Sequence, residues 1–469
     1  MPKVPKYQST GNSPLRQSRI PWTSHFRLPS GPAQRWHRQS PLRFLYSPVM
    51  AASLKIPVSI PRAFRFQRSS GRRLLPALLI IAALAFPLWH LQEMNRDFHL
   101  PPTHNDLISR WAGTRAALQG QDPYSPEVTQ QIEAVADHDS TEAFAYPAYF
   151  VVLLAPFASL SWKTFSVTYL IVVIPALLLG LWLSTRLLHL PITREKSALV
   201  AVLALSSWPV FWALRMQQPT LLASALILIA CFLLSRNHGL SAGFLLALAT
   251  FKPQLALPIV LWLAFWACID RRWTFLASFA VTMALLLSAA EIIVPGWFPH
   301  WLASAHAYQN RFGDLPLQSL LGRPLSVAVV LALAAWSGWR LWQMRNCPAF
   351  SPQFGLAAAL VFSVTVCTNF TQPMMIYNQI LLIPGCMLLV LTPRPAGNGL
   401  PIIVYRTAQF FVAWAFISVP VGIVAEALWK HPTVCDLLPF RNPLLPFLIA
   451  LFLLLTATRA ARSLPTASV

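Results

Sequence analysis

The stretch AGFLLALATFKPQLALP, residues 242–258, is apolar almost throughout, yet it carries a lysine followed by a proline. The surrounding apolar run, residues 240–268, is longer than the ~20 residues that cross a bilayer as one helix. Proline lacks the backbone N–H that a continuous helix needs and clashes with the preceding turn. We therefore expect this run to break at Lys252-Pro253 into two helices, one going up and one returning.

The rest of the chain predicts an all-α protein, a polytopic transmembrane helical bundle. Of its 469 residues, 56% are hydrophobic and 11% are charged, whereas a soluble chain carries about 25% charged residues. Helices are expected because backbone groups in lipid must be satisfied within each segment. The apolar segments predict two broken or re-entrant pairs, 144–162 and 240–268, and ten full spans. The full spans are 74–91, 165–187, 197–214, 218–235, 274–294, 322–342, 354–370, 377–392, 403–425 and 443–458.

The charge distribution predicts the orientation of the chain. Residues 1–73 hold 14 of the 36 Lys and Arg residues and no Asp or Glu. They read as a disordered basic cytoplasmic leader; initiation at Met50 and a nucleic-acid-binding arm are the alternatives, and we expect no nucleic acid. By the positive-inside rule, the transmembrane domain 74–458 then places the acidic loop 92–143 outside. The tail 459–469 falls in the cytoplasm, and the protein is expected in the cell (inner) membrane.

The outer loop contains NDLISRWAGTRAALQGQDPY, residues 105–124, in which Asp106 opens a predicted interfacial helix that Gly120 ends. The residues on the membrane-facing stripe of that helix would be Leu107, Trp111, Thr114 and Leu118. The sequence allows two roles for Asp106. It can cap the helix and pair with Arg110 four residues on, or it can act in chemistry on the extracytoplasmic side.

Further candidates lie at other predicted span ends. Lys252 can hold a phosphate as a point charge or extend to the interface as a structural residue. In RMQQPTLL, residues 215–222, Gln217 or Gln218 can bind a sugar hydroxyl, or the segment can be a plain polar turn. The outer segment 306–324 adds His306, Arg311 and Arg323. We interpret the aromatic residues of AFAYPAYFVVLLAP, residues 143–156, as an anchor in the membrane interface.

Several function classes are disfavoured by the motifs. The chain has no P-loop, GxGxxG, HExxH or nucleophile elbow, so no segment resembles a nucleotide-binding domain. Asp137-His138-Asp139 looks like an acidic metal motif, but no other ligand spacing supports it, and we expect neither a metal nor another cofactor. The six cysteines are scattered and predict packing residues.

The order of motifs along the chain resembles the family-87 glycosyltransferases, membrane enzymes of the GT-C fold. An Asp follows the first span, then come GQDPY at 120–124, Tyr146-Pro147, a glutamine at a span tip, and AGFLLALATFKP at 242–253. The resemblance covers about residues 75–390. It extends to polyprenyl-phosphate-mannose-dependent α-mannosyltransferases.

The resemblance implies a donor sugar carried on a polyprenyl phosphate and a glycan or glycolipid acceptor. It places the family's Asp base on Asp106, with Tyr124 ending the associated motif, and its lysine on Lys252. Arg311 or Arg323 would assist Lys252 in stabilising the leaving phosphate. The family's G-Q tip falls on Met216-Gln217, where methionine replaces glycine, and Arg110 stands where many members have tyrosine. The residues expected to bind substrate are Lys252, Arg110, Tyr124, Gln217, His306, Arg311 and Arg323. We therefore expect an inverting hexosyltransferase with mannose as the family's usual sugar.

Two other functions remain open from the residues alone. Broken hairpins with polar tips also occur in transporters, so a flippase of lipid-linked sugars is the main alternative. A non-catalytic membrane scaffold is the third, and it predicts that Asp106 and Lys252 tolerate substitution.

Overall fold

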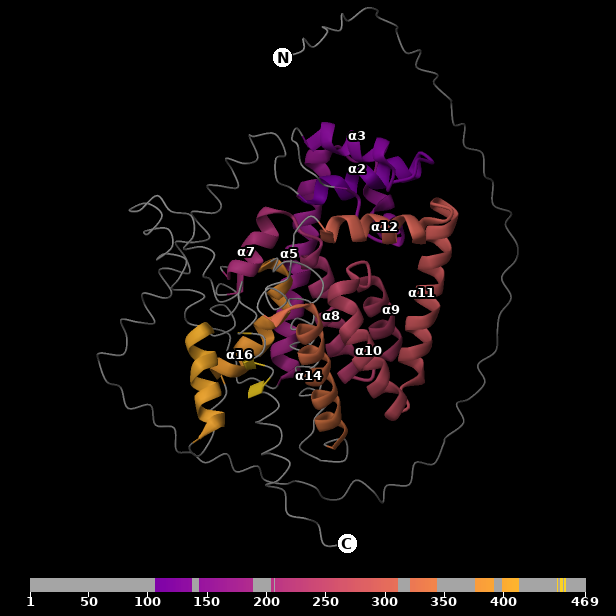
Figure 1. Ribbon diagram of the computed structural model, residues 1–469. Helices are drawn as coiled ribbons and strands as arrows, with labels where there is room; N and C mark the ends of the chain where they lie inside the picture. The colour runs from indigo at the N-terminus through magenta and orange to yellow at the C-terminus, as the bar shows by residue number, and fades with distance from the viewer. Residues whose placement is uncertain are drawn as a thin grey trace, which may run out of the picture. The chain divides into compact units, whose positions relative to one another are not determined.

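The computed structural model describes residues 106–136, 143–188, 204–205, 207–310, 321–343, 376–391, 399–412, 445, 448–449 and 451–452. Across these residues every regular element is a helix (Figure 1). The predicted leader 1–73, the spans 74–91 and 354–370, the motif 137–139 and the tail 459–469 lie outside them. The elements are α2 (Asp106–Leu118), α3 (Pro126–Ala136), α4 (Tyr149–Leu154), η3 (Ala155–Phe157), α5 (Trp162–Leu187), α7 (Trp208–Arg215), α8 (Thr220–Ser235), α9 (Gly239–Ala249), α10 (Pro253–Ile269), α11 (Trp273–Ile293), α12 (Trp297–Asn310), α14 (Arg323–Gln343), η4 (Ile376–Leu382) and α16 (Ile383–Leu391).

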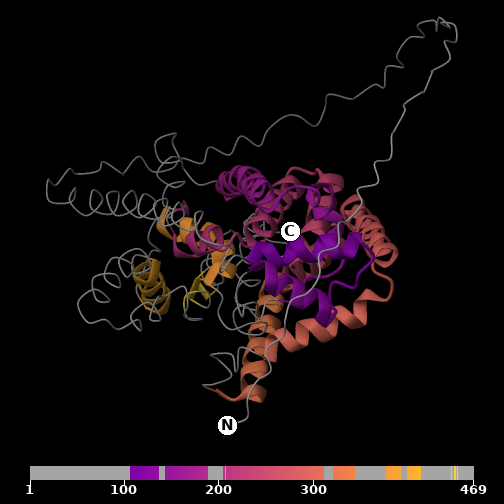
Figure 2. The ribbon, with the colours of Figure 1, turned by 90° about the horizontal axis from the view of Figure 1, so that it is seen from above.

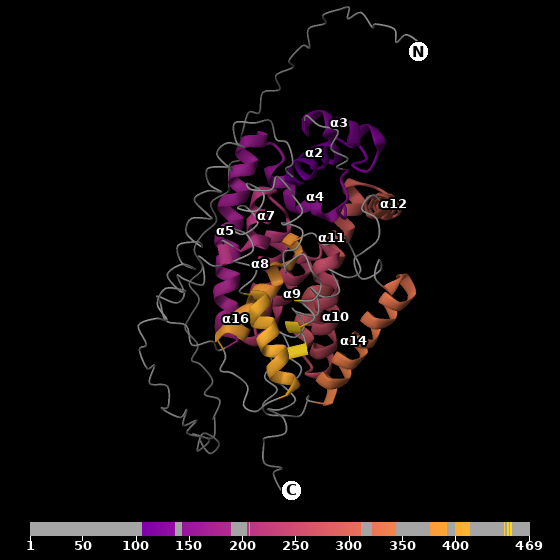
Figure 3. The same cartoon turned by 60° about the vertical axis from the view of Figure 1, so that its left-hand side comes forward.

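A row of neighbouring helices forms the scaffold. Helix α5 packs on α8, α8 packs on α9, and α9 packs on α11 (Figures 1 and 3). Helices α2 and α3 contact each other, and α2 also contacts α4 and α5. In Figure 2, which looks from above, α2 and α3 lie over the ends of the scaffold helices. Helices α2 and α3 therefore sit where several helices end.

Two glycines allow the scaffold helices to approach closely. A Cβ added at Gly243 of α9 would lie 2.5 Å from the carbonyl oxygen of Phe275 in α11. A Cβ at Gly180 of α5 would lie 3.1 Å from Cβ of Leu228 in α8. Small residues of this kind are enriched where helices pack in membranes, because they bring the backbones together.

The break expected in residues 240–268 is confirmed. Helix α9 ends at Ala249 and α10 begins at Pro253, with Lys252 immediately before it. Proline suits the first position of a helix, where its missing N–H costs nothing. The break places a lysine between two apolar helices, and this lysine is 2% exposed.

Two described helices, Trp162–Leu187 and Trp273–Ile293, are long and apolar enough to cross a membrane. They coincide with the expected spans 165–187 and 274–294. Other apolar helices, such as Thr220–Ser235, are shorter. The count of ten spans stays a prediction.

The aromatic residues of 143–156 are not an interfacial anchor, and that interpretation was wrong. Phe144, Tyr146 and Phe150 are buried among other side chains, with Tyr146 7% exposed. The Phe150 ring stacks on Phe251 with centroids 4.5 Å apart. The segment therefore forms part of the protein core beside Lys252.

Candidate active site

A pocket of about 290 Å³ opens where α2, the α9–α10 break and α12 come together. Among the described residues that line it, none carries a carboxylate, whereas two carry a positive charge. The lining residues are Arg110, Ala145, Tyr146, Gln218, Phe251, Lys252, Pro253, Gln254, Leu257, Trp301, Leu302, Ala305 and Tyr377. The pocket is thus positive at one part of its wall and apolar elsewhere.

Lys252 is the first of the two cations. Its Nζ donates to the hydroxyl of Thr220 and lies 3.4 Å from Oε1 of Gln218. It also sits 4.8 Å from the centre of the Tyr377 ring. Thr220 and Gln218 contribute neutral oxygens that hold the ammonium in place as hydrogen-bond acceptors.

Arg110 is the second cation, and it is 4% exposed. Its guanidinium donates to the backbone oxygen of Asp106 and to the Ser109 hydroxyl. It lies 4.8 Å from the centre of the Tyr146 ring. The face of an aromatic ring attracts a cation electrostatically. The two pocket cations therefore each rest on a tyrosine ring.

Asp106 is buried at the start of α2, one turn before Arg110. Its backbone N–H donates to the carbonyl of Met216 at 3.1 Å. A helix N-terminus favours a negative side chain, so this is a suitable place for an ionised carboxylate. Nine of the thirteen residues of α2 are buried. Its buried face thus includes charged residues as well as Leu107, while Leu118 of the expected apolar stripe is exposed.

The turn of residues 216–218 connects Asp106 with Lys252. Met216 accepts the backbone hydrogen bond of Asp106, and the Gln218 side chain contacts Lys252. Gln217 has a φ of 47°, in the left-handed region. The Ser166 hydroxyl lies 2.8 Å from Oε1 of Gln217. The residues expected to act as base and as phosphate ligand thus contact the same three-residue turn.

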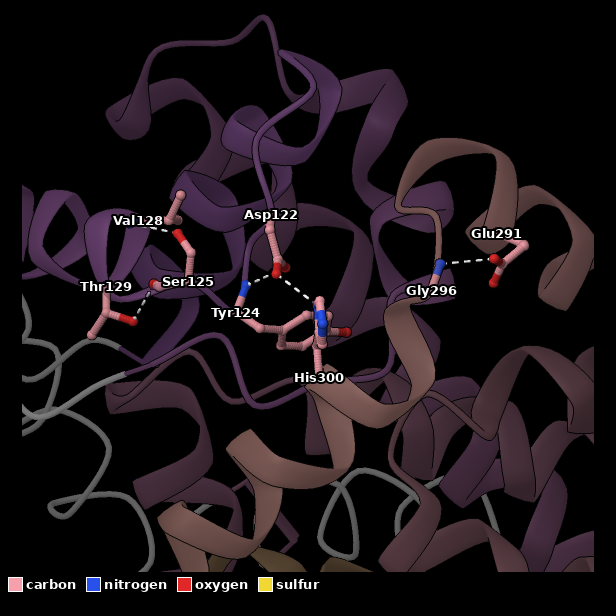
Figure 4. A network of polar contacts seen from close by, with 8 residues as sticks. All are labelled: Asp122, Tyr124, Ser125, Val128, Thr129, Glu291, Gly296 and His300. Atoms are coloured by element: carbon pink, nitrogen blue, oxygen red, sulfur yellow. Dashed lines mark hydrogen bonds and ion pairs between the residues drawn. The ribbon is translucent and has the colours of Figure 1, made fainter.

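Two bonds hold the outer segment against the pocket. The Tyr124 hydroxyl donates to the carbonyl of Tyr146 at 2.8 Å. Burial, and then the carboxylate of Asp122, raise the pKa of Tyr124, so this hydroxyl keeps its proton. Asp122 in turn lies 2.8 Å from Nδ1 of His300 in α12 (Figure 4). Through Tyr124 and Asp122, the GQDPY motif after α2 therefore contacts both the segment around Tyr146 and helix α12.

Residues 144–368, slightly less than half of the chain, match the sequence model of glycosyltransferase family 87. This match supports a family-87 glycosyltransferase. It indicates glycosyltransferase activity, in a family whose members are typically membrane proteins. No curated protein and no solved structure matched the chain.

The other site residues expected for a family-87 enzyme either do not line the pocket or are not described. Gln217 bonds to Ser166 and does not line the pocket, which its neighbour Gln218 does. His306 is exposed on α12, next to the pocket residue Ala305. Arg311 lies outside the described residues, and Arg323 begins α14 with its side chain not described. Their expected roles stay predictions.

The aromatic part of the pocket wall is not predicted by the sequence. Tyr146 has the composition of an interfacial residue, and no local pattern marks Tyr377. Arg110 lines the pocket together with Lys252, while the expected assistance of Arg311 or Arg323 to Lys252 stays a prediction, because neither side chain is described. Across the described residues, no group of three or more His, Cys, Asp or Glu is placed to hold a metal ion.

Proposed function

We propose that this family-87 enzyme is an inverting hexosyltransferase whose donor is a sugar on a polyprenyl phosphate. The hexose expected is mannose, and the acceptor is a lipid-linked or cell-envelope glycan. The reaction takes place on the extracytoplasmic side of the cell (inner) membrane. The two long apolar helices and the apolar part of the pocket wall, with Leu257 and Leu302, support a lipid-borne donor.

The observation that carries the proposal is the meeting of Arg110 and Lys252 in one pocket. They come from segments far apart in the chain, and both are buried. In a polyprenyl-phosphate sugar the phosphate is a diester with one negative charge. The polyprenyl phosphate that leaves is a monoester with up to two negative charges. Cations placed before the reaction therefore stabilise the charge that develops as the bond breaks.

Asp106 supplies the base in this scheme. Its carboxylate takes the proton of the acceptor hydroxyl as that oxygen forms a bond to C1 of the sugar. The bond between C1 and the phosphate oxygen breaks, and its electron pair stays on the phosphate. A single displacement inverts the anomeric centre. The phosphate leaves without a general acid when cations stabilise its charge, so one carboxylate is sufficient, unlike the two of a glycoside hydrolase.

The test is transfer of radiolabelled mannose from polyprenyl-phosphate-mannose by the full chain in lipid nanodiscs. Wild type is expected to transfer sugar with inversion. Asp106→Asn, which keeps the shape of the side chain, is expected to lower kcat about 10³-fold or more, at the upper end of what a general base contributes. Glu127→Gln removes an exposed carboxylate from the first turn of α3 and serves as the matched control.

Two outcomes would contradict the proposal. Retained activity in Asp106→Asn would remove Asp106 from the role of base. Movement of the lipid-linked sugar across a vesicle membrane by wild type, without transfer to any acceptor, would favour a flippase instead.

A further inference from the structure

Gln218 combines three properties that are found together at no other glutamine among the described residues. Its side chain lines the pocket and is 1% exposed. Its Nε2 is buried and has no hydrogen-bond partner in the part of the chain that the structure describes. A buried donor left unpaired costs about 1–3 kcal/mol. A cost of this kind, at the wall of a pocket, points to a ligand atom that supplies the missing acceptor.

The contact with Lys252 decides which way the Gln218 amide faces. An ammonium group donates hydrogen bonds and cannot accept them. Oε1 of Gln218 is the atom that lies 3.4 Å from Nζ of Lys252. Rotating the amide would set two donors against each other. The oxygen is therefore held by the lysine, and Nε2 is the atom that remains to donate elsewhere.

The backbone of Gln218 is fixed independently of its side chain. Its carbonyl accepts a hydrogen bond of 2.7 Å from the Tyr169 hydroxyl. Its N–H donates to the carbonyl of Ala213 at 2.8 Å. These bonds are made by backbone atoms of residue 218, so they survive replacement of the side chain. Substitutions at this position can therefore test the amide group without removing the turn.

We propose that Gln218 is a substrate-binding residue whose Nε2–H donates to an oxygen of the donor's sugar-phosphate head, beside the phosphate held by Lys252. This inference rests on the proposed function for the class of ligand. The oxygen belongs either to the phosphate or to a hydroxyl of the sugar, since both are acceptors. In the first case Gln218 strengthens binding of every polyprenyl phosphate, and in the second it selects for the sugar.

The experiment measures equilibrium binding of two radiolabelled lipids to the full chain in detergent micelles. The lipids are polyprenyl phosphate and polyprenyl-phosphate-mannose. Gln218→Met keeps the length of the side chain and removes the donor. Gln218→Glu also removes the N–H but keeps an oxygen toward Lys252. Both variants are expected to weaken binding of polyprenyl-phosphate-mannose about 10-fold or more, as the loss of one hydrogen bond to a charged or buried partner predicts.

Gln379→Met is the matched control. Gln379 is also fully buried with an unpaired amide among the described residues, but it does not line the pocket. Its replacement is expected to leave both affinities within about twofold, as for substitutions remote from a ligand. Weaker binding of both lipids by the Gln218 variants assigns the contact to the phosphate. Weaker binding of polyprenyl-phosphate-mannose alone assigns it to the sugar.

Equal affinities of wild type and both Gln218 variants would overturn the inference, and so would the absence of binding by wild type. Failure of the proposed function gives a different pattern. In that case wild type binds the lipids and the Gln218 variants bind them less well, but no sugar is transferred to any acceptor.

Discussion

Helix α9 and the break after it show opposite ways of using a buried position. In the middle of the helix, Gly243 brings the backbone of α9 against the backbone of α11. Just beyond its end, Lys252 places a buried ammonium in the pocket. The first contact is close apolar packing, and the second is a charge held by neutral oxygens and an aromatic ring.

This comparison distinguishes residues that pack the helices from residues that form the pocket. Packing of rigid helices determines where the helix ends lie, and the helix ends carry the polar residues. Substitutions at Gly243 should therefore act on stability, and substitutions in the pocket should act on the reaction. A variant that moved both properties together would break this separation.

Among the variants that test this comparison, the largest effect is expected for Lys252→Met. Loss of the cation beside the phosphate should lower kcat/KM about 10²–10³-fold, the range seen when one charge-stabilising donor is removed from an active site. The melting temperature should fall by a few degrees at most, because Thr220 and Gln218 each lose one hydrogen bond to the ammonium. Steady-state transfer and thermal unfolding on the same preparation check both values. A large fall in melting temperature would make Lys252 a structural residue.

A smaller effect, on stability alone, is expected for Gly243→Ala. The new Cβ would lie 2.5 Å from the Phe275 oxygen and 2.8 Å from the Phe279 nitrogen, so α9 and α11 must separate. Overpacking of this kind costs about 1–3 kcal/mol. Thermal unfolding measures it, with Ser241→Ala on the exposed side of α9 as control. KM of the folded fraction should not change, and a raised KM would show that packing and pocket are coupled.

Next comes Arg110→Lys, which keeps the charge and removes the planar fork. Lysine cannot reproduce the paired donation to the Asp106 oxygen and Ser109 hydroxyl while stacking on Tyr146. We expect kcat/KM to fall about 10-fold, the equivalent of one hydrogen bond to a charged group. Arg115→Lys is a matched control, because Arg115 stacks on Trp111 in the same helix but is exposed. Equal activity of the two variants would remove Arg110 from the pocket's function.

The smallest effect is expected for Tyr124→Phe. The variant loses the hydrogen bond to the Tyr146 carbonyl but keeps the ring packed on Phe144, whose centroid lies 5.6 Å away. One such bond contributes about 1 kcal/mol. The melting temperature should fall by a few degrees and kcat/KM by a few-fold at most. An unchanged melting temperature would show that the contact between the outer segment and Tyr146 does not depend on this hydroxyl.

The features that depend on local chemistry could be predicted from the sequence. Helix α2 begins at Asp106, and Gly120 follows its end with a φ of 79°, as the capping pattern indicates. The break before Pro253 follows from the missing proline N–H. Such signals lie within a few residues, so a single sequence contains them.

The features that depend on tertiary packing could not. Arg110 and Lys252 meet in one pocket, and no local pattern relates them. Tyr146 looks like an interfacial tyrosine until its neighbours are known, because composition alone does not distinguish a ring facing lipid from one facing a buried cation. The choice between Gln217 and Gln218 depended on the handedness of one residue in the turn, which the sequence MQQP does not reveal.

The left-handed backbone of Gln217 has a consequence for laboratory evolution. A glutamine in this region costs roughly 1–2 kcal/mol relative to an ordinary conformation, and a glycine there costs little. Gln217→Gly would relieve this strain, but it also removes a buried side chain and its hydrogen bonds with Ser166, which costs a similar amount or more. Selection of random variants for heat resistance should therefore not enrich the change. Selection for turnover should reject it as well, because that turn contacts both Asp106 and Lys252. Both selections should keep a glutamine at a position where the backbone alone would favour glycine.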